Sequence, residues 1–197
     1  MFSITTLNTL STDEQFEYIL NNKNEIVNNK NINTDSIQNQ KLKEVISSMA
    51  EKNCDITIAC CVIGYLDFLQ YLSNKGMIIN GKLSFYWAAI NGNLDCLEFL
   101  DSLGNEEITQ NQFNTDVVEV AAMNGHIECL KFLVNNNYPF DEDAVKLAER
   151  RGEQECAEYL RTNNNNPFDN IDIYDMAISE GLFENEQDII NQLNEMN

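Results

Sequence analysis

The chain has 197 residues, with 12 Lys and Arg against 32 Asp and Glu, a formal net charge of −20, and one histidine. Binding to nucleic acid through its phosphates requires clustered cations, so this charge argues against nucleic acid and against anionic membrane surfaces as partners. A single histidine is also a poor basis for histidine-dependent catalysis.

The N-terminus, Met1 to Gln15, lacks the basic and unbroken apolar regions of a secretory signal. The longest apolar stretch, Ile56 to Leu66, covers about half of what a bilayer requires. We therefore expect a cytoplasmic protein. Its six cysteines show no Cys-x-x-Cys spacing, which predicts reduced, buried thiols rather than disulfides or a zinc site.

The first predicted helix begins near Ser11, where Ser11 and Glu14 have the spacing of a capping box ahead of Phe16. A second helical pattern runs through residues 37–49, and the Asn-rich segment 21–34 between the two predicts a loop around a short apolar turn. Residues 1–53 therefore read as an N-terminal helical cap or a degenerate first repeat.

A repeat organises the chain from residue 54 onward. In each copy a glycine separates two helical patterns, and successive glycines lie 28, 33, 27 and 29 residues apart. These anchor glycines are Gly64, Gly92, Gly125, Gly152 and, in a fainter copy, Gly181. A glycine between two helices predicts a left-handed residue that closes the first of them.

An acidic residue stands three positions after every anchor glycine, where the dipole of the second helix favours it. These acids are Asp67, Asp95, Glu128, Glu155 and Glu184. Because the first turn of a helix favours a carboxylate, they need no catalytic role. Twelve positions after the anchors, left-handed helix ends are predicted at Gly76, Gly104, Asn137 and Asn164.

The first helix of a copy has its own start signal, a phenylalanine followed by an N-cap residue. The pairs are Phe113-Asn114, Phe140-Asp141 and Phe168-Asp169.

The segment Ala121-Ala-Met-Asn-Gly-His-Ile-Glu-Cys-Leu-Lys-Phe-Leu133 resembles the ankyrin repeat in its paired helices, its central Gly-His and the acidic-apolar run that follows. Together with the Asn-rich turn and Pro-Phe-Asp, Glu-Cys-Leu-Lys-Phe-Leu is similar to divergent ankyrin repeats of giant amoeba-infecting DNA viruses and amoebae. The resemblance covers residues 54–182. It implies an all-α, ankyrin-type α-solenoid of stacked helix-turn-helix repeats and, for a viral protein, a location in the host cytoplasm.

Most intervals are shorter than the usual repeat of about 33 residues, so we expect short or reduced β-turn fingers, with room for an ordinary finger only between Gly104 and Asn114. The repeat array is expected over residues 54–170. Residues 171–197 are expected to form a degenerate C-terminal capping repeat with a more polar outer surface.

The repeat assigns structural roles to residues that would otherwise suggest a site. Trp87 occupies the position of Ala59 in the preceding copy and is therefore expected in the core, as are Cys96, Cys129 and Cys156. His126 is expected to cap and pack. No catalytic, cofactor-binding or metal-binding residues are proposed, so we expect no enzyme activity and no cofactor.

The leading functional hypothesis is a non-catalytic protein-interaction module or scaffold, viral if the resemblance holds, that binds through the exposed edge of its first helices. The residues expected there are Tyr86, Asn91, Glu119, Asn124, Lys146, Arg151 and Asp175. Charge complementarity favours a protein partner with a basic or mixed surface, and self-association or a virion role are further hypotheses. The alternative is a ubiquitin-ligase substrate adaptor, because Leu10 to Leu20 faintly resembles an F-box opening, although it lacks the usual proline.

Overall fold

The structure is a computed structural model that describes residues 2–29, 32–52, 54–77, 79, 81–104 and 113–163. It divides into two units, Met1–Glu158 and Tyr159–Asn197. The expectations placed on residues 164–197, which include Asn164, Asp175 and the C-terminal cap, lie outside the described residues. So does most of the segment between Gly104 and Asn114, where an ordinary finger was expected. Within the described ranges every regular element is a helix.

The N-terminal part contains four helices before the first anchor glycine. They are α1 (Ile4–Leu7), α2 (Thr12–Asn21), α3 (Lys23–Asn28) and α4 (Gln40–Lys52). The capping box at the start of α2 is confirmed, since the Ser11 backbone N–H donates to the Glu14 carboxylate at 2.9 Å. The loop predicted over residues 21–34 is interrupted by α3, because Ile26 is fully buried and fixes this turn of helix in the core.

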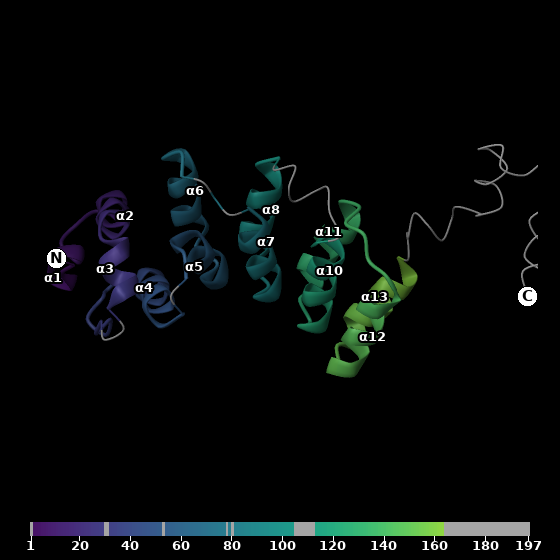
Figure 1. Ribbon diagram of the computed structural model, residues 1–197. Helices are drawn as coiled ribbons and strands as arrows, with labels where there is room; N and C mark the ends of the chain where they lie inside the picture. The colour runs from purple at the N-terminus through teal and green to yellow at the C-terminus, as the bar shows by residue number, and fades with distance from the viewer. Residues whose placement is uncertain are drawn as a thin grey trace, which may run out of the picture. The chain divides into compact units, whose positions relative to one another are not determined.

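Four helix pairs follow, one at each of the first four anchor glycines (Figure 1). The first helices are α5 (Ile56–Ile63), α7 (Gly81–Ile90), α10 (Phe113–Met123) and α12 (Glu142–Arg151). The second helices are α6 (Leu66–Asn74), α8 (Leu94–Ser102), α11 (Ile127–Asn135) and α13 (Gln154–Thr162).

The predicted left-handed positions are confirmed at all four anchors, with φ of +72° at Gly64, +68° at Gly92, +73° at Gly125 and +84° at Gly152. The second helices end in the same way, and Asn137 is the residue other than glycine that adopts a positive φ, +60°, among those described. The acids predicted in the first turn of the second helices lie there in all four pairs.

The predicted start of the first helix is confirmed in one copy and wrong in another. Asp141 is the N-cap of α12 and accepts a hydrogen bond from the Asp143 backbone N–H at 2.8 Å. Asn114, in contrast, lies inside α10, which already begins at Phe113. Pro139 disfavours a helical Tyr138, whereas the equivalent residue before Phe113 is Gln112, which imposes no such restriction.

In the first unit, successive helix pairs pack on one another. The first helices α5, α7, α10 and α12 contact one another in that order, and the second helices α6, α8 and α11 form a parallel series of contacts. The core between them is apolar, and Cys96, Cys129 and Cys156 lie in it as expected. Stability in such an array is a sum of pair and neighbour terms.

Trp87 is not a core residue, contrary to the expectation from its repeat position. Its side chain is half-buried and meets the Tyr86 ring edge-to-face at 6.4 Å between centroids. The equivalent residues Ala59 and Val120 are small and buried. Because interiors are close-packed, the space that holds an alanine or a valine does not admit an indole, which lies partly at the surface instead.

The N-terminal helices pack on the array in the reverse order to a repeat. The earlier helix α2 contacts the second helix α6, and the later helix α4 contacts the first helix α5. Phe16 of α2 stacks on Phe68 of α6 at 4.3 Å between ring centroids, and the neighbouring Glu17 accepts a hydrogen bond from the Tyr71 hydroxyl at 2.6 Å. The order of these contacts is therefore the reverse of that between two successive helix pairs of the array.

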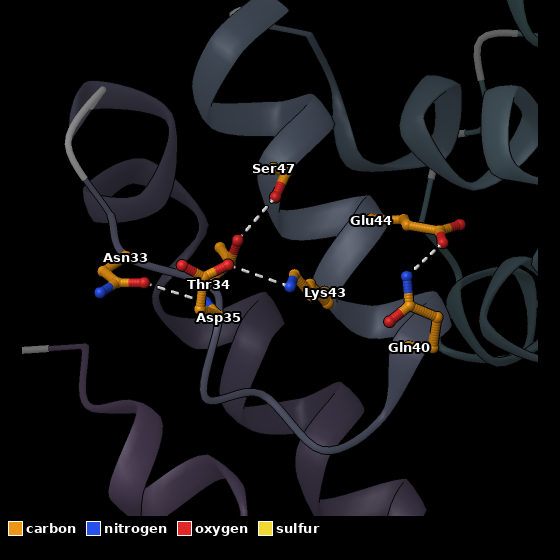
Figure 2. A network of polar contacts seen from close by, with 7 residues as sticks. All are labelled: Asn33, Thr34, Asp35, Gln40, Lys43, Glu44 and Ser47. Carbon is orange, nitrogen blue, oxygen red and sulfur yellow. Dashed lines mark hydrogen bonds and ion pairs between the residues drawn. The ribbon is translucent and has the colours of Figure 1, made fainter.

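Polar contacts hold the connection that leads into α4 (Figure 2). The Thr34 and Ser47 hydroxyls lie 2.9 Å apart, and the Lys43 ammonium lies 3.1 Å from the Asp35 carboxylate. The Asn33 side chain accepts a hydrogen bond from the Asp35 backbone N–H, which closes a local turn. These contacts tie the connection to the side of α4.

Candidate functional site

The site predicted from the sequence lies on the first helices, at two positions in each copy: six residues and one residue before the anchor glycine. In the structure these residues are half-buried or exposed, and we call them the first-helix face. Its members are Tyr86 and Asn91 at α7, Glu119 and Asn124 at α10, and Lys146 and Arg151 at α12. The predicted member Asp175 lies outside the described residues.

The two asparagines of the first-helix face have a structural task in their own helices. The Asn91 side-chain amide donates to the Trp87 carbonyl oxygen at 2.7 Å, and the Asn124 amide donates to the Val120 carbonyl oxygen at the same distance. Both carbonyls lie in the last turn, where a helix leaves acceptors unsatisfied. These amides therefore terminate α7 and α10 in the same way.

Glu119 stands in the most acidic part of the face. Burial raises the pKa of its carboxyl, and the nearby charges of Asp141, Asp116 and Asp143 raise it further. We call these four residues the acidic corner. Lys146 on the face pairs within its own helix with Glu142 at 3.1 Å and with Asp143, a member of the acidic corner, at 3.4 Å.

The part of the face on α5 and α7 is apolar instead. At the two face positions α5 carries Ile58 and Ile63, both half-buried. On α7, Leu83 is 41% exposed, and Trp87 is half-buried. We call these four residues the apolar patch. The sequence indicated this patch by placing isoleucine instead of polar residues at the two face positions of α5. That difference did not enter the prediction of the site.

The residues that follow Gly92 and Gly125 reach back to the preceding pair, a contact that the sequence did not predict. The Asn93 amide donates to the carbonyl oxygens of Cys61 at 2.7 Å and Val62 at 3.0 Å, at the C-terminus of α5. His126 does the same one pair later, with its Nε2 atom 2.8 Å from the Ile90 carbonyl oxygen. The capping role expected for His126 is therefore directed at the preceding first helix and not at its own, where it makes no side-chain cap bond.

Within the described ranges, no group of three or more His, Cys, Asp or Glu could hold a metal ion. Burial raises the pKa of the Cys96, Cys129 and Cys156 thiols to about 11, and negative charges nearby contribute to the rise. Since the thiolate is the reactive form, these cysteines belong to the core and not to a site. No described helix is long and apolar enough to span a membrane.

Helix pairs closed by left-handed glycines, stacked neighbour on neighbour, agree with the comparison to known families. The family model of ankyrin repeats matches this chain at residues 85–175, in three copies. Searches of curated proteins and of solved structures found no match. Ankyrin repeats indicate a protein-interaction module, and the family is generally non-catalytic.

The matched ankyrin repeats begin within α7 and include the acidic corner, whereas α5 and α6 precede them. The α5–α6 pair has the same left-handed anchor, Gly64, and the same first-turn acid, Asp67. The described chain is thus an all-α array of ankyrin-type helix pairs that starts before the matched segment.

Proposed function

We propose that this protein is a non-catalytic scaffold that binds a protein partner with a basic or mixed surface on its first-helix face. The observation that carries the proposal is the contrast within each first helix. The inward residues stay small and apolar, as at Ala88, Ala121 and Ala148, while the outward residues change chemistry from copy to copy. A constant scaffold with a variable face is suited to recognising one particular surface.

Electrostatics supports the choice of partner. The chain carries a net charge of −20, and Glu119 has three aspartates near it. Such a field steers basic surfaces toward the face and repels nucleic acid and anionic membranes.

A matched pair of charge reversals tests this proposal. Partners captured from the native cell by the full chain at physiological salt are tested against Glu119→Lys on the first-helix face and Glu98→Lys at an exposed position of the second helix α8. Both variants change the net charge equally. We expect Glu119→Lys to lose the partner and Glu98→Lys to retain it, and equal behaviour of the two variants would contradict binding through this face.

The ends of the chain have capping roles in this proposal. Residues 1–53 would protect one end of the array, which is supported by the burial of Phe16 against Phe68. Residues 171–197 would protect the other end, on the basis of their apolar periodicity and polar remainder. A viral origin, action in the host cytoplasm and self-association belong to the same proposal and rest on sequence resemblance and composition.

The adaptor alternative concerns the N-terminal segment. Two apolar residues of the F-box-like stretch, Phe16 and Ile19, are already buried. A ligase subunit would have to use the exposed side of α2, where Asp13 lies. Formation of a complex between the full chain and a purified Skp1-type subunit, lost on Asp13→Lys, would support the adaptor. A complex that persists in the Asp13→Lys variant would refute recruitment of the ligase subunit through the exposed side of α2.

A further inference from the structure

Two exposed asparagines of the first helices stand directly before an anchor glycine, in the sequences Asn91-Gly92 and Asn124-Gly125. In an Asn-Gly sequence the backbone nitrogen of the glycine reaches the asparagine side chain readily, because glycine has no Cβ to hinder the approach. We infer that Asn124 is a site of spontaneous deamidation in the folded protein and that His126 shields Asn91 from the same reaction. The inference concerns the chemistry of the chain itself and goes beyond the proposed function.

The reaction needs no enzyme and no reagent other than water. The backbone nitrogen of the glycine loses its proton and forms a bond to Cγ of the asparagine, while the side-chain nitrogen takes up a proton and leaves as ammonia. Water then opens the succinimide ring at one of its two carbonyl carbons, which yields aspartate or isoaspartate. Either product carries a negative charge where the asparagine was neutral.

At the first site both reacting groups are engaged in hydrogen bonds of the helix end. The Asn91 side-chain amide donates to the Trp87 carbonyl oxygen at 2.7 Å. The Gly92 backbone N–H donates to the Ala89 carbonyl oxygen at 3.3 Å. The attack therefore requires the end of α7 to open, because both bonds hold their groups away from each other.

The second site repeats these two local bonds at the end of α10. The Asn124 side-chain amide donates to the Val120 carbonyl oxygen at 2.7 Å. The Gly125 backbone N–H donates to the Ala122 carbonyl oxygen at 3.2 Å. The two asparagines are therefore matched in their own helices, and a difference between them has to come from the following repeat.

The following repeat protects the first site and not the second. Nε2 of His126 lies 2.8 Å from the Ile90 carbonyl oxygen, and a Cβ atom built on Gly92 would lie 2.5 Å from its Nδ1 atom, so the imidazole rests on this turn and ties it down. At Gly125 the equivalent residue is Glu153, whose carboxylate lies at the same place but has no proton to donate to a carbonyl oxygen. Opening of the turn thus breaks one more hydrogen bond at Asn91 than at Asn124.

Conversion of Asn124 weakens the end of α10. The carboxylate of the product cannot donate to the Val120 carbonyl oxygen, and the helix dipole disfavours a negative charge at this end. Asn124→Asp reproduces one of the two products and should lower Tm by about 4 °C. The reaction therefore marks aged chains with a looser helix end and one more negative charge.

Incubation of the full chain at mildly alkaline pH, in buffer and in concentrated urea, tests the inference. Tandem mass spectrometry measures conversion at each asparagine separately, including Asn80, which precedes Gly81 and lies outside the described residues. In urea we expect similar rates at Asn91 and Asn124, because glycine follows both. In the folded chain Asn124 should convert about 25-fold more slowly than in urea, since two hydrogen bonds must open and each contributes a factor of about five. Asn91 should be slower than Asn124 by a further factor of about five.

Two variants should shift the two sites independently. His126→Ala should raise the folded-state rate at Asn91 about fivefold and leave Asn124 unchanged. Glu153→Asn supplies an amide of the kind that Asn93 directs at α5, and it should slow Asn124 about fivefold without affecting Asn91. Because both asparagines are read in one chain, a variant that loses its fold is recognised by acceleration at both sites, and the other variant then decides.

Three results would overturn the inference. The first is equal conversion of Asn91 and Asn124 in the folded wild-type chain, since His126 would then give no protection. The second is a folded chain in which Asn124 stays unconverted over the period in which the 25-fold slower rate predicts measurable product. The third is a rate at Asn124 that Glu153→Asn leaves unchanged in a folded variant, because the contact from the following repeat would then not control the reaction.

Discussion

Replacing Gly92 by alanine tests how neighbouring repeats are joined. Gly92 has a φ of +68°, and a Cβ atom built on it would lie 2.5 Å from Nδ1 of His126 in the next pair. The left-handed backbone alone costs about 1 kcal/mol in a residue with a Cβ. In addition, His126 would have to move away from the Ile90 carbonyl oxygen that it contacts at 2.8 Å. A lost hydrogen bond and a crowded contact add about 2 kcal/mol, so we expect Gly92→Ala to cost about 3 kcal/mol.

Gly76→Ala is the matched control, because it has the same backbone requirement without the neighbour. Gly76 has a φ of +71°, and no atom lies within 4 Å of a Cβ built there. It should therefore lose only the backbone term, about 1 kcal/mol. The difference of about 2 kcal/mol between the variants corresponds to about 4–8 °C in Tm for a chain of this size.

Thermal and urea unfolding followed by circular dichroism, and by fluorescence of the single tryptophan, Trp87, would measure both variants. The double variant Gly92→Ala with His126→Ala removes the crowding and should recover part of the loss. Equal destabilisation by Gly92→Ala and Gly76→Ala would refute the interpretation that the glycine is required by the next repeat as well as by its own turn.

Three further predictions concern single side chains. The pKa of Glu119 is raised in the folded state, so its ionisation destabilises the fold as pH rises through that pKa. Glu119→Gln should therefore increase the free energy of unfolding at pH 7 by about 0.5 kcal/mol, a value kept small because solvent screens the charges. Urea titrations at pH 7 and pH 3 should show this gain at pH 7 and no gain at pH 3. Phe16→Ala should lower stability by about 3–5 kcal/mol in the same assay, because its ring is 2% exposed and stacks on Phe68; a loss below 1 kcal/mol would show that the N-terminal helices do not stabilise the array. The Glu153 carboxylate lies against Gly125, at the C-terminus of α10. Glu153→Asn would place an amide donor there instead, and should raise stability by about 1 kcal/mol. An unchanged melting temperature would contradict this prediction.

The features that the sequence predicted correctly are those that depend on a few neighbouring residues. A left-handed helix end needs a residue type and a position, so Gly64 and Asn137 were identified from spacing alone. The capping box of Ser11 and Glu14 and the N-cap of Asp141 are local in the same sense. Asn114 shows the limit, since its helix starts earlier where no proline restrains the chain.

The features that the sequence did not predict depend on contacts between elements. Ile26 makes a helix of a polar segment because it fits into the core. Trp87 has the sequence position of the buried Ala59 and Val120 but lies partly at the surface. The candidate site stays a prediction: its polar residues were chosen from positions expected to be exposed, and the apolar patch was noticed only once α5 and α7 were seen to pack side by side.

The residue after the anchor glycine shows why spacing alone was insufficient. In isolation, each of Asn93, His126 and Glu153 is the residue before its own second helix, and Asn93 and His126 also fit the preference for caps there. Instead, the first two direct donors at the last carbonyls of the preceding first helix, across a gap of more than 30 residues in sequence. The glycine must be bare on the side where this residue arrives, so the two positions constrain each other between repeats. An acid at the third position breaks the pattern of donors. The junction at Gly125 and Glu153 therefore lacks the side-chain donor that the junctions at Asn93 and His126 have, and α10 and α12 are held together there by their packing.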